Sequence, residues 1–372
     1  MIQQIQAKRL TSLGASLPEA DELIRYTENA FDLGSLGPGT AFPLPDEPFV
    51  ALWQGWAEEA RERGAFAVLS EHLPQLRFPI QEGISQTADY RAATRRGVSP
   101  DDLPGATGLE LERPERIELE IHESPAGRIP VLLLRGRPEF AAVVRALGKR
   151  NEPVPVPDSQ GALMIGGFNN WTRIRELQRR GEEIAPATPR ELYQDRFILL
   201  SDGPYSAVPA ADLGLREEEW REISLAIRRD HECAHYFTRR LFGSMRNNVL
   251  DELIADYAGM VAAVGSFHAG WFLRFLGLED YPRYRAGGRL DLYRGDPPLS
   301  DGAFRILHTL IRSAAGNVER FDARFQGRPR TLADRALMLA TLASLRLDEI
   351  ASPEAETLLE TSMESLRRRL EW

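Results

Sequence analysis

The sequence has very little cysteine, since Cys233 is the single one among 372 residues. One cysteine cannot form a disulfide within the chain, and it excludes a cysteine-rich zinc knuckle. No run of about 18 apolar residues occurs, so no membrane-spanning helix is predicted. Residues 1–13 are polar and lack the apolar core of a secretory signal. These absences predict a soluble, cytoplasmic protein that has no membrane partner.

Basic residues are also fewer than acidic ones. The chain has 46 lysines and arginines against 55 aspartates and glutamates, which gives a formal net charge of −9. The basic residues are dispersed rather than gathered in one tract, which argues against contacts with a phosphate backbone. We therefore predict no nucleic-acid partner. The hydrophobic share of 43% and the charged share of 27% are typical of an ordinary globular protein.

One stretch of the chain carries a pattern with chemical meaning, the sequence His-Glu-Cys-Ala-His at residues 231–235. It lies inside the helical pattern of 216–242, and residues four apart on a helix share one face. His231 and His235 can therefore bind one metal ion together. Glu232 follows the first histidine directly, where it can act as a general base for a bound water. Cys233 lies off this face and is expected to be a small buried residue rather than a nucleophile.

A second stretch, on the helix predicted at 249–264, supplies two carboxylates on one face. Glu252 and Asp256 are four residues apart. Glu252 can complete a site with three protein ligands and one open position, while Asp256 can hold the other ring nitrogen of a histidine. The reverse assignment, with Asp256 as the third ligand, remains open. For the histidine motif alone, the competing interpretation is a buried helix whose histidines only bind their neighbours.

The two stretches together resemble the zincin metallopeptidases. Within them the pattern is similar to the gluzincin branch, in which a following helix supplies a glutamate ligand and an aspartate four residues later supports a histidine. The metzincin branch is excluded, because it expects a glycine and a further histidine where this chain has Thr238 and Leu241. The residues that the resemblance places in the site are the Zn²⁺ ligands His231, His235 and Glu252, the general base Glu232 and the supporting carboxylate Asp256.

The resemblance implies a zinc-dependent hydrolase, a metallopeptidase or amidase acting on a peptide or amide substrate that the sequence does not identify. The oxyanion of such a reaction needs a donor besides the metal. Gluzincins often supply a downstream histidine or tyrosine, and the candidates here are His308, Tyr281, Tyr284 and Tyr293. The alternative is a non-catalytic protein with a structural or vestigial zinc site, which would keep the ligands but would not need Glu232.

Periodicity predicts an α+β fold in three consecutive sections. Residues 1–107 are expected to be mainly helical, 108–205 to carry a small mixed or antiparallel sheet, and 206–372 to form a helical section with the metal site. The expected strands are 116–122, 129–134, 162–165 and 197–200. The resemblance implies a zincin-like arrangement, in which an edge strand, 197–200 or 162–167, holds an extended substrate.

Overall fold

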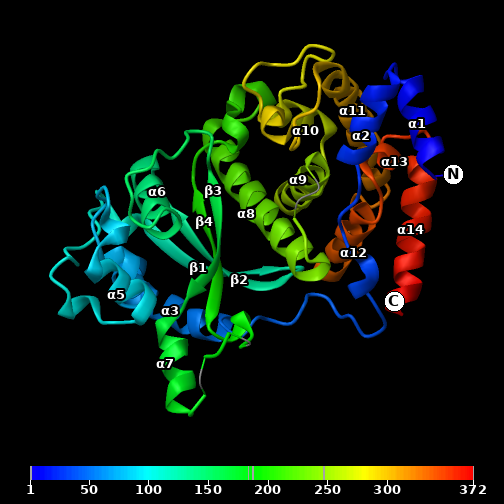
Figure 1. Cartoon of the computed structure of the whole chain (residues 1–372). Coiled ribbons are helices and arrows are strands. Elements are labelled where there is room, and N and C mark those ends of the chain that lie inside the picture. The colour runs from blue at the N-terminus through cyan, green and yellow to red at the C-terminus, as the bar shows by residue number, and fades with distance from the viewer. Residues whose placement is uncertain (1, 183, 187, 246–247, 372) are drawn as a thin grey trace. The chain divides into compact units, whose positions relative to one another are not determined.

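The computed structural model describes residues 2–182, 184–186, 188–245 and 248–371. The fold is mixed α/β with one small four-stranded sheet, as the sequence predicts (Figure 1). Contacts divide the chain into two compact units, residues 46–203 and residues 1–45 with 204–372. The division into three consecutive sections stays a prediction. Across the described ranges, every helix is too short or too polar to cross a membrane.

The sheet belongs to the unit 46–203. Its strands are β1 (Ile117–Ser124), β2 (Gly127–Leu134), β3 (Ala162–Asn169) and β4 (Gln194–Ser201). Their order is β1-β2-β4-β3, with β2 and β4 parallel and the other two pairs antiparallel. β4 is therefore an interior strand, and the prediction of an edge strand at 197–200 is wrong. The strand that contains 162–167 is β3, which does lie at an edge.

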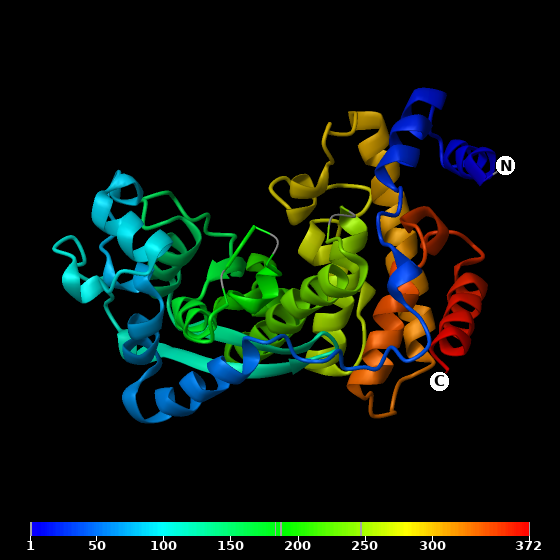
Figure 2. The ribbon, with the colours of Figure 1, turned by 60° about the horizontal axis from the view of Figure 1, so that its bottom comes forward.

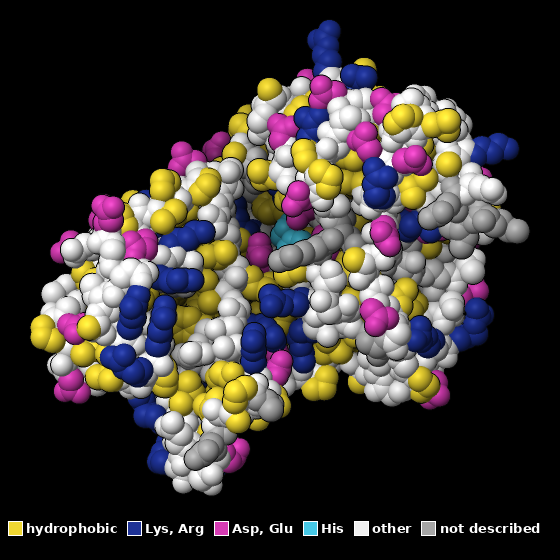
Figure 3. Space-filling view, in the orientation of Figure 1, with side chains coloured by type: hydrophobic (Ala, Val, Ile, Leu, Met, Phe, Trp, Pro, Cys, Tyr) yellow, Lys and Arg dark blue, Asp and Glu magenta, His cyan; other side chains and the backbone are white. Residues whose placement is uncertain are grey.

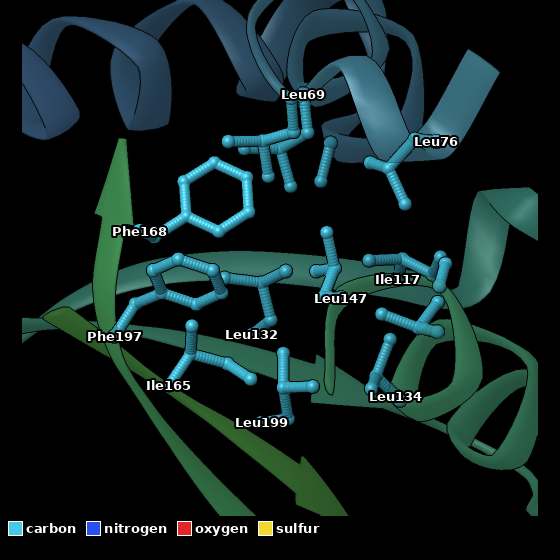
Figure 4. Packing of buried hydrophobic residues seen from close by; sticks show 14 of the residues in the cluster. Leu69, Leu76, Ile117, Leu132, Leu134, Leu147, Ile165, Phe168, Phe197 and Leu199 are labelled. Carbon is cyan, nitrogen blue, oxygen red and sulfur yellow. The ribbon is translucent and has the colours of Figure 1, made fainter. Parts of the chain in front are cut away.

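The helices of this unit are α3 (Val50–Arg63), α4 (Ala65–His72), α5 (Ala88–Arg96), α6 (Arg137–Val143) and α7 (Trp171–Arg179). Figure 4 shows Leu69 and Leu76 facing the sheet residues Leu132 and Leu199 across the core. Alternate residues of a strand point to one face, and burying each such side chain contributes about 1.5–3 kcal/mol. This apolar layer holds the sheet against α3 and α4.

The helical unit is built from both ends of the chain. Its helices are α1 (Ile2–Ser12), α2 (Leu17–Tyr26), α8 (Glu217–Phe242), α9 (Val249–Val264), α10 (Ala269–Leu276), α11 (Asp301–Ala323), α12 (Leu332–Ala343), α13 (Leu347–Ile350) and α14 (Ala355–Leu370). The N-terminal helices lie beside the C-terminal ones (Figures 1 and 2). The amide of Gln6 donates to the buried Asp348 at 3.1 Å, and Arg9 does so at 3.1 Å. On the face in Figure 3, acidic and basic side chains of this unit are interspersed.

Helices α8 and α9 are neighbours. α8 is followed by its C-cap Gly243, whose φ of 68° is the left-handed conformation that glycine adopts most readily. The two helices approach so closely that a Cβ on Gly259 of α9 would lie 2.5 Å from the backbone oxygen of Ile227 on α8. Glycine at this position therefore permits the contact between the helices that brings their polar residues together.

Candidate metal centre

Both histidines of the motif lie on the face of α8 that is turned into the helical unit. His231 and His235 are 6% and 8% exposed, although imidazoles are usually more accessible. Their Nε2 atoms are 3.1 Å apart. The i, i+4 spacing predicted this shared face, and the neighbouring Cys233 is buried. Two ring nitrogens are thereby aimed at one point.

Glu252 of α9 brings a carboxylate to the same point. Its Oε2 lies 3.7 Å from Nε2 of His231, and its Oε1 lies 3.5 Å from Nε2 of His235. The three ligand atoms all fall within 4.8 Å of one another, close enough to hold one metal ion. Oε2 is buried and has no hydrogen-bond partner among the described residues. A buried acceptor without a donor is costly, and a bound cation would satisfy it.

Asp256 lies on the other side of the His231 ring. It is fully buried, and its Oδ1 accepts a hydrogen bond from Nδ1 of His231 at 2.8 Å. The opposite ring nitrogen, Nε2, is the one that faces Glu252. This geometry favours Glu252 as the third ligand and Asp256 as the carboxylate that orients the histidine. The reverse assignment would require the Asp256 carboxylate to leave its present partner.

Two further side chains complete this cluster, and sequence reasoning missed both. Tyr205, in the short helical turn η8 (Tyr205–Ala207), donates its hydroxyl to Asp256 and lies 2.8 Å from Nδ1 of His231. Arg289, the first residue of the short helical turn η10 (Arg289–Tyr293), donates to the Tyr205 hydroxyl at 3.0 Å and pairs with Asp256. Both stand in irregular segments with no motif around them, so no local signal in the sequence could have identified them.

The charges of the cluster are strongly coupled. Burial by itself would raise the pKa of Glu252, but the hydrogen bond to His235 and the charges of His231 and Arg289 lower it well below its usual value. Burial would likewise lower the pKa of His235, yet Glu252 and neighbouring carboxylates raise it to about 9. The pKa of Asp256 is lowered despite burial, first by Arg289 and then by His231. Both carboxylates are therefore ionised at neutral pH.

Glu232 differs from the ligands in its surroundings. It is half-buried, and within the described ranges it forms no hydrogen bond or ion pair. Its negative charge nevertheless contributes to the raised pKa of His235, which places it close to the histidine pair. A carboxylate without a protein partner can accept a proton from a water or a substrate. The role of general base that the motif predicts for Glu232 stays a prediction.

Of the four candidates for an oxyanion donor, Tyr293 is brought to the cluster. It is the last residue of η10 (Arg289–Tyr293). Burial raises the pKa of Tyr293, Arg289 lowers it, and the charge of Glu252 and a hydrogen bond to that carboxylate raise it further. The net effect is a pKa far above the ordinary value for tyrosine. Its hydroxyl therefore remains protonated and can act as a hydrogen-bond donor beside the ligands.

The other three candidates are engaged elsewhere. The hydroxyl of Tyr281 lies 2.9 Å from that of Thr309, and the hydroxyl of Tyr284 donates to a backbone carbonyl at 2.7 Å. His308 packs against the ring of Phe304, with the ring centres 4.6 Å apart. In the described ranges, the structure shows no contact of these three side chains with the candidate ligands His231, His235 and Glu252. The sequence could not identify the oxyanion donor among the four candidates, because their positions depend on the course of the loop before α11.

Comparison with known proteins gives a family but no activity. No curated protein and no solved structure matches the chain significantly. A family match extends over residues 8–354, which include every residue of the candidate metal centre. The family is described as "Family of unknown function (DUF7005)", and this protein belongs to it.

Proposed function

We propose that this protein is a zinc-dependent hydrolase, a metallopeptidase or amidase with a zincin-like, gluzincin-type site. The observation that carries the proposal is the convergence of His231, His235 and Glu252 next to Glu232, a carboxylate without a partner among the described residues. Two structural histidines could pack in a helix without such a neighbour. The substrate is proposed only as a class, a peptide or another amide.

The donor set suits zinc. Two imidazole nitrogens and one carboxylate oxygen are the ligands of many catalytic zinc sites, which leave one position open. Oε2 of Glu252 is buried and accepts no hydrogen bond among the described residues, which fits a cation at this point. Zn²⁺ held by these three residues would polarise a substrate carbonyl and lower the pKa of a water. These are the two tasks that amide hydrolysis requires.

The protein's own residues have separate roles in this proposal. Glu232 accepts a proton from the attacking water and returns it to the leaving amine. Tyr293 donates a hydrogen bond from its hydroxyl to the oxyanion that develops on the carbonyl. Asp256 holds Nδ1 of His231, so that Nε2 is presented to the ion. Arg289 balances the charge of the buried carboxylates.

The decisive experiment combines a metal assay with a hydrolysis assay on Glu232→Gln. We expect the wild-type protein to contain about one zinc per chain, and the variant to retain zinc while losing hydrolysis by roughly 10²–10⁴-fold. Glu222→Gln, an exposed change on the same helix, is the matched control and should leave both unchanged. A broad peptide library serves as substrate.

Two outcomes would contradict the proposal. Absence of stoichiometric zinc in the wild-type protein would remove its basis. Bound zinc with no hydrolysis that depends on Glu232 would instead select the alternative, a non-catalytic protein whose zinc holds α8 and α9 together.

A further inference from the structure

A cavity lies in the helical unit, and its lining includes none of the candidate metal ligands. Its volume is about 240 Å³. The apolar part of its wall comes from α9, α12 and α14 and from the turn after α11, and consists of Val261, Phe325, Leu337, Met338 and Met363. Ligand sites usually combine such apolar walls with a few polar groups, and drug-sized ligands need roughly 300–1,000 Å³. This cavity is therefore suited to a smaller molecule.

The polar part of the wall is rich in arginine. Four arginines line the cavity: Arg328, Arg330, Arg335 and Arg367. Arg328 and Arg367 are exposed, and neither side chain forms a hydrogen bond or ion pair with another residue in the described parts of the chain. The Nε atoms of Arg330 and Arg335 are buried and find no acceptor there. A protein with a net charge of −9 thus places four cations and several unused donors around one cavity.

The acidic residues nearby offset most of this charge but not all of it. Arg330 binds Asp322 at 2.6 Å, and Arg335 lies 3.5 Å from Asp230. The third carboxylate is Asp334, which lines the cavity and also accepts hydrogen bonds from Thr331 in a helix cap. Arg229 shares Asp230 at 3.5 Å, so this carboxylate is not available to Arg335 alone. The two exposed arginines, Arg328 and Arg367, have no carboxylate partner in the described parts of the chain, and a carboxylate on the ligand would supply one.

We propose that this cavity binds a small monocarboxylic acid with a short apolar chain. The chain would occupy the apolar wall, and the carboxylate would bind Arg328 and Arg367. The planar guanidinium group pairs with a carboxylate through two parallel hydrogen bonds, and such charge-assisted bonds are stronger than neutral ones. This proposal is independent of the activity at the metal centre.

The test is calorimetric titration of the full-length protein with hexanoate as the probe. Acetate carries the charge without the chain, and 1-hexanol carries the chain without the charge. We expect one site with a dissociation constant of about 1 mM or lower for hexanoate, and binding at least about tenfold weaker for each comparison compound. Equal binding of acetate or of hexanol would overturn the proposal, as would no hexanoate binding at about 10 mM.

Variants locate the site. In the double variant Arg328→Gln with Arg367→Gln, hexanoate affinity should fall at least about tenfold. Both positions are exposed, so the fold should persist, which circular dichroism checks. Arg283→Gln with Arg305→Gln is the matched control, since these arginines are exposed and lie outside the cavity wall. Unchanged affinity in the first double variant would show that hexanoate binds elsewhere, the metal centre included, and would overturn the proposal.

Discussion

Nδ1 of His231 on α8 donates a hydrogen bond to the fully buried carboxylate of Asp256 on α9, at 2.8 Å. This contact joins the two helices and fixes the orientation of the ring. Nε2 of His231 faces Glu252 on the opposite side of the ring. A metal-binding histidine needs this orientation. The hydrogen bond therefore prepares the candidate site before any ion binds.

Loss of the hydrogen bond between His231 and Asp256 should weaken zinc binding without abolishing it. We expect Asp256→Asn to retain one zinc per chain, with an affinity about 10–100-fold lower, because the ring is less well oriented. Glu252→Gln should lose stoichiometric zinc, because it removes a ligand. Competition with a chelator measures both. Asp212→Asn, which breaks an exposed ion pair, is the control. If the Glu252 variant kept zinc and the Asp256 variant lost it, Asp256 would be the third ligand and Glu252 the supporting carboxylate.

Removal of the Tyr293 hydroxyl should affect turnover and not metal binding. Tyr293→Phe is expected to lower kcat by about 10²–10³-fold, since one donor to the oxyanion is lost. Zinc content and KM should change little. Tyr281→Phe, whose hydroxyl binds Thr309, is the matched control with full activity. A Tyr293 variant with normal kcat would exclude this residue as the oxyanion donor.

The close approach of α8 and α9 can be tested at Gly259. In Gly259→Ala, the new Cβ would meet Ile227 at 2.5 Å, so the helices must move apart. We expect a loss of about 1–3 kcal/mol in the free energy of unfolding, with weaker zinc binding. Gly270→Ala is the control, since no atom lies within 4 Å of its Cβ position, and it should be neutral or stabilising by up to about 1 kcal/mol. Urea unfolding measures both. Equal stability of the two variants would refute a backbone contact.

The stability of the metal-free protein should depend on pH through His235. The pKa of this histidine is about 9 in the folded protein, against about 6.5 for an unperturbed histidine. The folded state holds the proton more tightly, so this stabilisation is complete below about pH 6.5 and is lost as the pH rises through about 9.

We therefore expect the free energy of unfolding of the metal-free protein to fall across this window, measured with urea at several pH values. Zinc affinity should rise across the same window, because the ion must displace that proton. His235→Gln removes the titrating group and serves as the control. The same decline of stability in this variant would show that another group is responsible.

Local patterns in the sequence were sufficient to predict the helices that carry the candidate site. The period of the apolar residues predicted a helix at 216–242, and α8 spans Glu217–Phe242. The same spacing rule placed His231 and His235 on one face. The four strands were also predicted, although β3 and β4 are longer than expected, because pairing with a neighbouring strand extends a strand beyond its apolar residues.

Only the tertiary structure decided which distant residues meet. β4 became an interior strand because β2 and β3 pair on its two sides, which no pattern within 197–200 could reveal. Tyr205, Arg289 and Tyr293 joined the two helices through irregular segments, whose course depends on packing rather than on local propensity. The sequence by itself determined the helices and the ligand types, because these follow from neighbours along the chain. The tertiary structure decided the partners of those ligands, because burial and charge act between residues that are neighbours only in space.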